Sequence, residues 1–382
     1  NATTPPDQAV LDLFAEVAKA VPGNPASEQH APGQQARSLV DQARQQVADT
    51  FGVGPSSVVW TSGATESLYI AILSFLRSCP AEKRNIVIAS TEHKAALAAA
   101  DLASELFGAR VDRVHCDGSG VIRVSDVDDL MDASTALVCV MGANNETGVI
   151  NPVDDIGSLC RQRGVTYLCD ATQMIGKASI DRLASAADMV ALSGHKVYGV
   201  KGTGALLINR ETKRELRPMF SGGGQEGSLR GGTLNVPGVA SLGLAVSNAV
   251  QRTGEFEAHN WRLSQEFVEE VHRLVPDVLV IGDGAERVAN TNMIRVVGAD
   301  AEAVMANMPN VHVSTGSACN SAVTEPSHVL LAMGLSSQEA SECLRFSFGK
   351  GSTLTEIKEA AVSLDPERLC SCSARPRNIP CR

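Results

Sequence analysis

The sequence predicts an α/β protein with a mainly parallel sheet, followed by a second, smaller α+β domain. Between about residues 55 and 210, short β-rich runs alternate with alanine-rich helical stretches, which is typical of a layered α/β structure. The length of 382 residues exceeds what one small hydrophobic core usually serves. Residues 277–365 then return to a mixed pattern, which indicates a second unit.

The elements follow in order along the chain. We expect the β-rich runs of the first part to be strands, namely SSVVWTS, NIVIAS, ARVDRVHC, TALVCVMG, VTYLCDAT, ADMVALSG and GALLIN. Helices are expected at ESLYIAILSFLRSC, KAALAAADLASELFG and DDIGSLCRQRG, and again over 235–276. In the second part, DVLVIG, NMIRVV and CLRFSFGK are expected to be strands. The predicted division is a large domain over 10–255, a small domain over 256–365 together with 1–9, and a flexible tail over 366–382.

Composition excludes several classes of protein. A net charge of −10 argues against direct binding of nucleic acid, which needs clustered basic residues. No run approaches the ~18 apolar residues that span a membrane, and the start at Asn1 shows neither an initiator Met nor a signal pattern, so a processed leader stays open. Most of the ten cysteines lie in apolar runs, so we expect inert thiols in a reducing, cytoplasmic compartment.

Polar residues gather where the predicted strands end. Because the carboxyl ends of parallel strands meet at one edge of a sheet, these clusters predict a single small-molecule site. The clusters are Ser62-Gly63-Ala64-Thr65, Glu92-His93-Lys94, Asn144-Asn145-Glu146, Asp170-Ala171-Thr172-Gln173 and Ser193-Gly194-His195-Lys196.

The run VVWTSGATESLYIAI predicts a strand, a glycine turn and a helix. The first-turn amides of that helix, with the hydroxyls of Ser62 and Thr65, could hold a phosphate group. Ser62 and Thr65 could instead only cap the helix, which is a common role for these residues. A Walker motif is absent, so nucleotide hydrolysis has little support.

Asp170 and Lys196 each end a predicted strand. A pyridoxal phosphate enzyme needs such a pair, because a lysine holds the cofactor aldehyde as a Schiff base and a carboxylate keeps the pyridine nitrogen protonated. A loop-capping Asp170 and a surface lysine are the alternatives. Lys201 is a rival for the lysine, but GVKGTG is typical of an outward turn, so we favour Lys196.

Further residues suit the same site. His93 could stack on a cofactor ring or move protons, or it could be structural. Gln173 could donate to the ring hydroxyl, and Asn145 could contact cofactor or substrate. Arg345, within an apolar run, could clamp a substrate carboxylate or form an internal salt bridge.

Cys319 differs from the other cysteines of the main body because it lies among Ser, Thr, Gly and Ala in VSTGSACNSA. Such a setting favours an accessible, reactive thiol, although an ordinary buried cysteine is the alternative. Cys370, Cys372 and Cys381 lie in the tail; they could relay sulfur or bind metal, but their spacing falls short of a standard zinc pattern.

These residues occur in segments that resemble the cysteine desulfurases of the NifS/IscS family, in order and along nearly the whole chain. The segments are NATTP, GNPASEQHAPGQQAR, TSGATES, TEHKA, NNETGVINP, DATQMIGK, SGHKVYGVKGTGAL, GGGQEGSLRGGTLN, STGSACNSA and LRFSFGK. The resemblance implies the aspartate-aminotransferase-like architecture (fold type I), bound pyridoxal 5′-phosphate and a homodimer with active sites at its interface. The GSAC segment is similar to that of the group I subclass. The chain has RGGT where RSGT is commoner in the family.

The resemblance also implies roles for single residues. Lys196 would hold the cofactor covalently, His93 would stack on its ring, Asp170 would pair with the pyridine nitrogen and Gln173 would face the ring hydroxyl. A further set would hold the phosphate, with Thr233 reaching in from the other subunit: Gly63, Ala64, Thr65, Ser193, His195 and Thr233. Asn145 and Arg345 would bind the substrate carboxylate.

The implied reaction converts L-cysteine to L-alanine, with Cys319 taking the sulfur as a persulfide and passing it to an acceptor or scaffold protein. Iron–sulfur cluster assembly, tRNA thiolation and DNA phosphorothioation are all possible destinations. The alternatives are another pyridoxal phosphate-dependent class V aminotransferase, a selenocysteine lyase, or a non-catalytic scaffold of the same fold.

Overall fold

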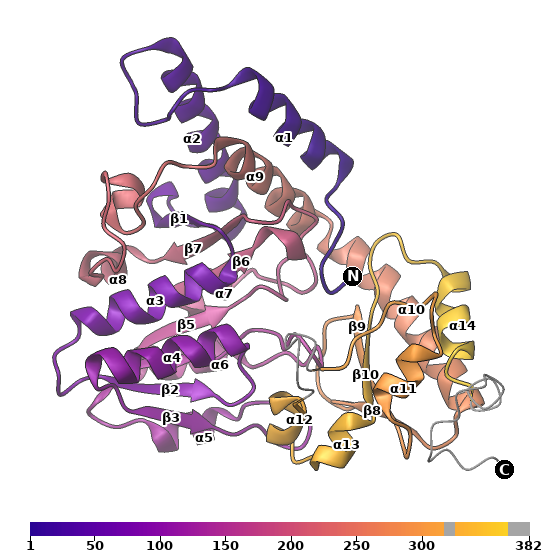
Figure 1. Ribbon diagram of the computed structural model, residues 1–382. Helices are drawn as coiled ribbons and strands as arrows, with labels where there is room; N and C mark the ends of the chain where they lie inside the picture. Colours follow the sequence, from indigo (N-terminus) through magenta and orange to yellow (C-terminus); the bar gives the residue numbers. More distant parts are fainter. Residues whose placement is uncertain (317–324, 366–382) are drawn as a thin grey trace.

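The structure, a computed structural model, describes residues 1–316 and 325–365. A large sheet with its helices forms one part of the molecule, and a three-stranded sheet with its helices forms the other (Figure 1). Cys319, Cys370, Cys372 and Cys381 lie outside the described residues, as does the expected tail.

The large sheet confirms the predicted α/β class. Its strands are β1 (Val58–Thr61), β2 (Asn85–Ala89), β3 (Val111–Val114), β4 (Thr135–Cys139), β5 (Thr166–Asp170), β6 (Met189–Ser193) and β7 (Gly204–Ile208). Their order is β1-β7-β6-β5-β4-β2-β3, and the run from β6 to β3 is parallel. Only β7 is antiparallel to its neighbours β6 and β1. Every strand except β7 therefore ends at the same edge of the sheet.

Helices cover both faces of this sheet (Figure 1). They are α1 (Gln8–Ala20), α2 (Ala31–Phe51), α3 (Ala64–Ser78), α4 (Lys94–Phe107), α5 (Val124–Leu130), α6 (Val153–Arg163), α7 (Leu183–Ala186), α8 (Arg210–Glu215) and α9 (Val236–Gln251). Alternate residues of β2 show the two faces: Ile86 and Ile88 pack in the core under α3 and α4, whereas Val87 packs in the core under α2, α6 and α9. Both faces are buried, which explains the unbroken apolar strands of the sequence.

The second part has its own sheet and core. Strands β8 (Val278–Ile281), β9 (Thr291–Val296) and β10 (Cys343–Ser347) form an antiparallel sheet. Phe267 of α10 (Thr253–Leu274) packs on Phe346 of β10, with ring centroids 4.6 Å apart. The remaining helices are α11 (Ala301–Ala306), α12 (His328–Ala332), α13 (Ser337–Ser341) and α14 (Leu354–Val362). The predicted boundary after residue 255 falls within the first turn of α10, and the division into domains stays a prediction.

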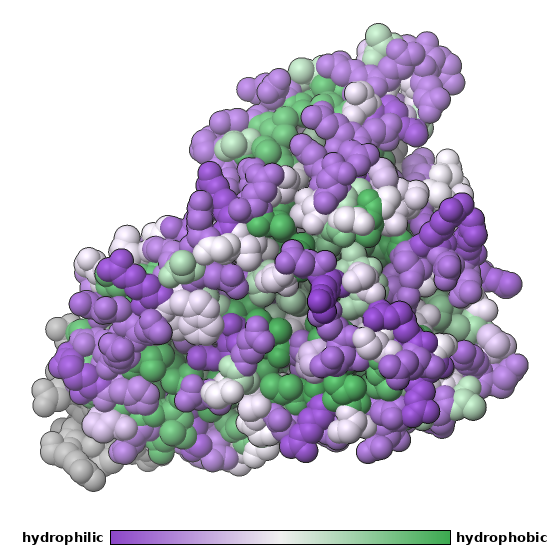
Figure 2. Space-filling model, turned by 180° about the vertical axis from the view of Figure 1, so that it is seen from behind, coloured by the Kyte–Doolittle hydropathy of each residue, from purple (hydrophilic) through white to green (hydrophobic). Residues whose placement is uncertain are grey.

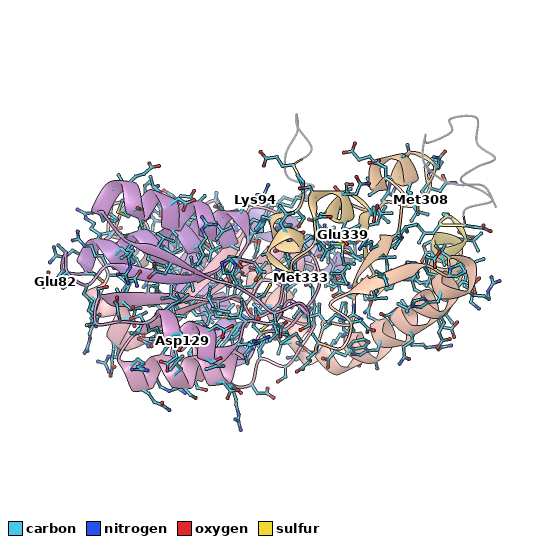
Figure 3. All side chains as sticks on the ribbon, turned by 90° about the horizontal axis from the view of Figure 1, so that it is seen from below. Glu82, Lys94, Asp129, Met308, Met333 and Glu339 are labelled. Carbon is cyan, nitrogen blue, oxygen red and sulfur yellow. The ribbon has the colours of Figure 1, made fainter. Side chains whose placement is uncertain are left out.

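Helix α12 connects the two parts. His328 Nε2 lies 2.8 Å from the backbone oxygen of Glu92, which precedes α4. Figure 3 labels Lys94 at the start of α4 and Met333 just after α12, in the region where the two parts meet. This contact places α12 near the carboxyl end of β2.

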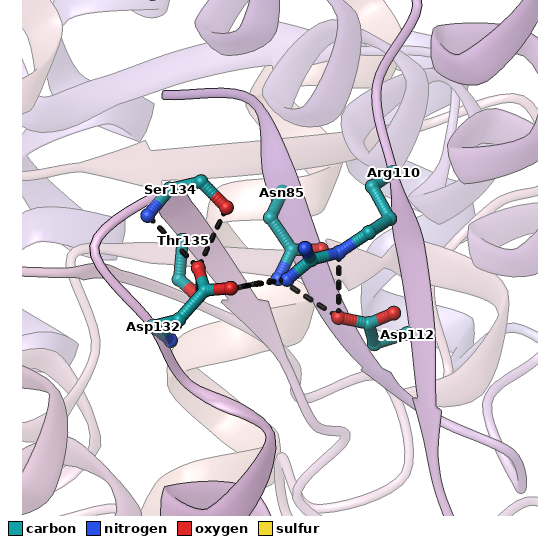
Figure 4. Close-up of polar contacts among 6 residues, drawn as sticks. All are labelled: Asn85, Arg110, Asp112, Asp132, Ser134 and Thr135. Atoms are coloured by element: carbon teal, nitrogen blue, oxygen red, sulfur yellow. Dashed lines mark hydrogen bonds and ion pairs between the residues drawn. The ribbon is translucent and has the colours of Figure 1, made fainter. Parts of the chain in front are cut away.

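The opposite edge of the large sheet carries a polar network that fixes strand register (Figure 4). Asp112 Oδ2 accepts hydrogen bonds from Arg110 Nε at 3.0 Å and from Asn85 Nδ2 at 2.9 Å. Arg110 also pairs with Asp132 at 2.6 Å. The network joins β3, β2 and the turn before β4 far from the strand ends that carry the predicted site, so its role is structural.

Hydrophilic side chains cover much of the face shown in Figure 2, with small hydrophobic areas between them. Within residues 1–316 and 325–365, none of the helices has the length and apolar character needed to cross a membrane.

Close backbone packing joins the loop after β1 to the start of β7. A Cβ atom added to Gly204 would lie 2.5 Å from Gly63 Cα and 2.7 Å from Leu192 O. Both neighbours are backbone atoms that cannot rotate away, so only glycine fits. The loop that begins α3 therefore lies directly beside the end of β6.

We predict that Gly204→Ala lowers the free energy of unfolding by about 2 kcal/mol or more, because the new methyl group overpacks a rigid site. Denaturation by urea, followed by circular dichroism, measures the change. Gly254→Ala is the matched control, since no atom lies within 4 Å of a Cβ at that position in α10 and alanine favours helix. Equal stability of the two variants would contradict the packing argument.

Candidate active site

A cavity of about 600 Å³ opens at the edge where the strands of the large sheet end, next to β10. It is lined by most of the predicted site residues: Gly63, Ala64, Thr65, His93, Asn145, Asp170, Gln173, Ser193, His195, Lys196 and Arg345. Cavities of about 580 and 500 Å³ lie elsewhere, but their linings contain none of these residues.

One predicted residue among those described, Thr233, does not line this cavity. Thr233 is exposed, and Cys319 lies outside the described residues. The segment before Thr233 is anchored beside α3, because Arg230 Nε donates to Glu66 Oε1 at 2.7 Å. The predicted role of Thr233 in another subunit stays a prediction.

The start of α3 forms one end of the cavity. Its N-cap is Gly63, and no side chain caps the helix. The structure thus shows no cap by the Ser62 or Thr65 side chain at this position, which Gly63 occupies. Ser193 Oγ lies 3.5 Å from where a Cβ of Gly63 would be, so a hydroxyl faces the uncapped end across a gap kept open by glycine. Such an arrangement suits a phosphate group.

His195 lies on the other side of this end of the cavity. Its Nδ1 is 3.1 Å from Thr3 Oγ1. Burial, with the positive charges of Lys196, Lys201 and Lys177, lowers the pKa of His195 to about 4. A neutral ring that accepts from Thr3 at Nδ1 carries its proton at Nε2, where it can donate to an anion.

Lys196 enters the cavity from a short 3₁₀ turn, Gly194–Lys196, directly after β6. Its Nζ donates to Ala2 O at 2.6 Å. The turn is fixed from the other side, because Thr4 Oγ1 accepts from Tyr198 N at 2.8 Å and donates to His195 O at 3.1 Å. Lys201 also lines the cavity, but its side chain is exposed, which agrees with the predicted outward turn.

Asp170 and His93 lie at the ends of β5 and β2. Asp170 is buried, and one of its oxygens accepts from Thr172 N at 3.0 Å. His93 Nδ1 accepts from Ala95 N at 3.1 Å and so caps α4. Burial lowers the pKa of His93. The cap fixes a neutral ring with its proton at Nε2, so His93 is held structurally and also lines the cavity.

Arg345 reaches the cavity from β10. Its guanidinium donates to Asn145 O at 2.7 Å and to Ser314 Oγ at 3.3 Å. Asn145 Oδ1 is buried without a hydrogen-bond partner among the described residues. These contacts join the loop after β4 to the second sheet and bring the two residues predicted to bind a carboxylate together.

Reasoning from the sequence missed Lys177. This lysine is buried and donates to Gln173 Oε1. Burial, with the nearby charges of Lys196 and Arg345, lowers its pKa to about 7. The sequence does contain a sign of this burial. Lys177 follows the apolar residues Met174 and Ile175 closely after Gln173, and a lysine in such a run has little access to water.

The lining fits pyridoxal phosphate. Thr172 Oγ1, like Asn145 Oδ1, is a buried polar atom without a partner among the described residues, as expected beside a polar ligand. An amine, a carboxylate, a histidine ring and an uncapped helix start provide a contact for each functional group of that cofactor. Among the described residues, no group of three or more His, Cys, Asp and Glu could hold a metal ion.

Comparisons with known proteins agree with this site. The model of the aminotransferase class-V family matches residues 1–359. A cysteine desulfurase of Frankia sp. (strain EuIK1) is 39% identical over 370 residues, which cover 94% of this chain and 88% of the relative. A solved structure of a NifS-like protein superposes with a TM-score of 0.87 at 31% identity, covering 95% of this chain and 96% of that one.

A second solved structure is described as SspA in complex with cysteine. It has a TM-score of 0.79 and 32% identity, and covers 92% of this chain and 98% of its own. The resemblance to cysteine desulfurases and the α/β architecture expected with it are thereby confirmed. This chain belongs to the aminotransferase class-V family, in which it groups with the cysteine desulfurases.

Proposed function

We propose that this protein is a pyridoxal phosphate-dependent cysteine desulfurase, which converts L-cysteine to L-alanine and takes the sulfur onto Cys319. The observation that carries the proposal is the meeting of Lys196, Asp170 and Arg345 in one cavity. These side chains suit, respectively, a cofactor aldehyde, a pyridine nitrogen and a substrate carboxylate.

Pyridoxal phosphate, when bound, supplies an aldehyde that condenses with amines and a ring that withdraws electrons from the substrate carbon next to the amine. The start of α3, with Ser193 and His195, would hold its phosphate. Asp170 would hold the ring nitrogen, and His93 would cover the ring. Lys196 would hold the aldehyde.

The remaining steps use side chains of this chain. Once substrate is bound, the freed Lys196 amine removes the proton next to the substrate amine. Arg345 and Asn145 hold the substrate carboxylate, which orients the substrate. The Cys319 thiolate then attacks the substrate sulfur: a sulfur–sulfur bond forms, the carbon–sulfur bond breaks, and its electron pair stays on the carbon, which takes up a proton. Lys196 returns a proton to the carbon next to the amine, alanine leaves, and a persulfide remains on Cys319.

We further propose a cytoplasmic homodimer that passes sulfur to an acceptor or scaffold protein and does not bind nucleic acid directly. The exposed position of Thr233 supports a role in a partner subunit. The cysteines of the described residues are free thiols, which supports a reducing compartment, and the net charge of −10 disfavours nucleic acid. Iron–sulfur assembly, tRNA thiolation and DNA phosphorothioation all remain candidate destinations of the sulfur.

The decisive test incubates the protein with pyridoxal phosphate, L-cysteine and a thiol reductant, and measures alanine and sulfide together. We expect equal amounts of both, and loss of both in Cys319→Ala because the thiol that takes the sulfur is gone. Cys79→Ala is the control, since burial raises the pKa of the Cys79 thiol and keeps it protonated. Products that persist without Cys319 would disprove the persulfide step, and no turnover in the wild type would favour an aminotransferase or a scaffold.

Lys196→Arg tests the choice of lysine. We expect it to abolish the visible absorbance of the covalently held cofactor and to lower kcat by at least about a hundredfold, because an arginine neither condenses with an aldehyde nor accepts a proton at neutral pH. Lys201→Arg should retain the absorbance band and most of the activity. The reverse pattern would assign the cofactor to Lys201.

The pKa of His195 predicts how stability depends on pH. The folded protein holds this ring neutral down to about pH 4, whereas the unfolded chain takes up the proton near pH 6.5. The unfolded state therefore binds more protons between these values, and stability falls as pH falls through that window. We expect the melting temperature of the cofactor-free protein to fall less steeply there in His195→Gln. Equal slopes for His195→Gln and wild type would contradict this, with His272→Gln on the exposed face of α10 as the control.

A further inference from the structure

Lys177 is a buried lysine that has no acidic partner among the described residues. Its exposed fraction is 3%. Among the described residues, its side chain donates a hydrogen bond to Gln173 Oε1, and the charged groups that act on it are the cations Lys196 and Arg345. Burying an ammonium group with so little compensation is costly, so the fold retains it at the expense of stability. A buried lysine that costs stability is a candidate for a role in function.

The backbone holds Lys177 firmly in this position. Lys177 N donates to Met174 O at 2.8 Å in the turn that follows β5. Gly176 before it has a φ of 71°, in the left-handed region, and a Cβ there would lie 2.7 Å from Ala249 Cβ of α9. The close contact with α9 therefore fixes the turn and directs the lysine behind Gln173.

Gln173 lies between Lys177 and the cavity. Gln173 lines the candidate active site, whereas Lys177 does not line it and instead borders the neighbouring cavity of about 500 Å³. In its protonated form the Lys177 ammonium has only donors, so it bonds the oxygen of the Gln173 amide and not its nitrogen. With its oxygen bonded to Lys177, Gln173 keeps its NH₂ group available as a donor to the cavity.

We propose that Lys177 is a positioning residue, which fixes the amide of Gln173 so that its NH₂ group donates to the ring hydroxyl oxygen of the cofactor. The inference rests on the proposed function, because it needs pyridoxal phosphate in this cavity. When Lys177 is protonated, its positive charge adds to the effect, since a cation behind the amide stabilises negative charge on the oxygen that receives the hydrogen bond.

A purely structural role would predict a different outcome. If Lys177 only filled space, Gln173 could turn its amide either way, and removing both side chains would multiply their separate effects on cofactor binding. If Lys177 acts through Gln173, removing the second side chain after the first adds little, because both changes remove the same hydrogen bond to the cofactor.

The test is a double-mutant cycle on the full-length protein, with Lys177→Met, Gln173→Leu and the double variant. The dissociation constant for pyridoxal phosphate is measured by titrating cofactor-free protein and following the visible absorbance. We expect each single variant to raise Kd by about tenfold, and the double variant by about tenfold as well, since one charge-assisted contact is lost in all three. Lys83→Met, on the exposed surface between α3 and β2, is the control and should leave Kd unchanged.

Two results would overturn the inference. One is a Kd unchanged in Lys177→Met, and the other is a double variant weakened by about a hundredfold, the product of independent effects. If Lys177→Met does not fold, as judged by circular dichroism, Lys177→Gln replaces it; this amide can donate or accept, so it no longer imposes one orientation on Gln173, and the same non-additivity is expected. A wild type that fails to bind pyridoxal phosphate would instead disprove the proposed function.

Discussion

Backbone packing between Gly63, Gly204 and the end of β6 brings the two halves of the candidate active site together. Because β7 runs against its neighbours, its first residue lies at the edge where the other strands end. The absence of a side chain at Gly204 lets the loop after β1 approach that edge directly. The uncapped start of α3 thereby faces Ser193 and the turn that carries Lys196. Without this contact, separate loops would hold the start of α3 and the turn that carries Lys196.

Positive charge gathers at the candidate active site, although the chain as a whole is negatively charged. The chain has a net charge of −10, yet Lys177, Lys196 and Arg345 lie close enough to affect one another. Burial, with the charges of Lys196 and Arg345, lowers the pKa of Lys177, and burial, with the charges of Lys196, Lys201 and Lys177, lowers that of His195. Such a concentration of positive charge favours the binding of anions, and a phosphate group and a substrate carboxylate are anions of this kind.

Several residues of the cavity are held by contacts that also build the fold. His93 caps α4 through Nδ1, so one bond both ends a strand-to-helix turn and sets the tautomer of the ring. Arg345 donates to the backbone of Asn145, so the residue predicted to bind substrate also joins the second sheet to the loop after β4. The structural and functional interpretations weighed for these residues are therefore compatible, because a side chain fixed by the fold is also a side chain oriented for binding.

The sequence by itself determined the class of fold and most of the residues that line the candidate site. Apolar strand runs alternating with helices predicted the sheet, because a strand that is buried on both faces consists mainly of apolar residues. Polar clusters after those runs predicted the cavity, because parallel strands end at one edge. The tertiary structure alone decided which hydrogen bonds those residues make. That α3 has no side-chain cap, that Lys177 lies behind Gln173, and that Gly204 touches Gly63 each depend on segments far apart in the chain. Local sequence patterns do not predict these contacts, because the distances between distant segments are set only when the helices and strands pack together.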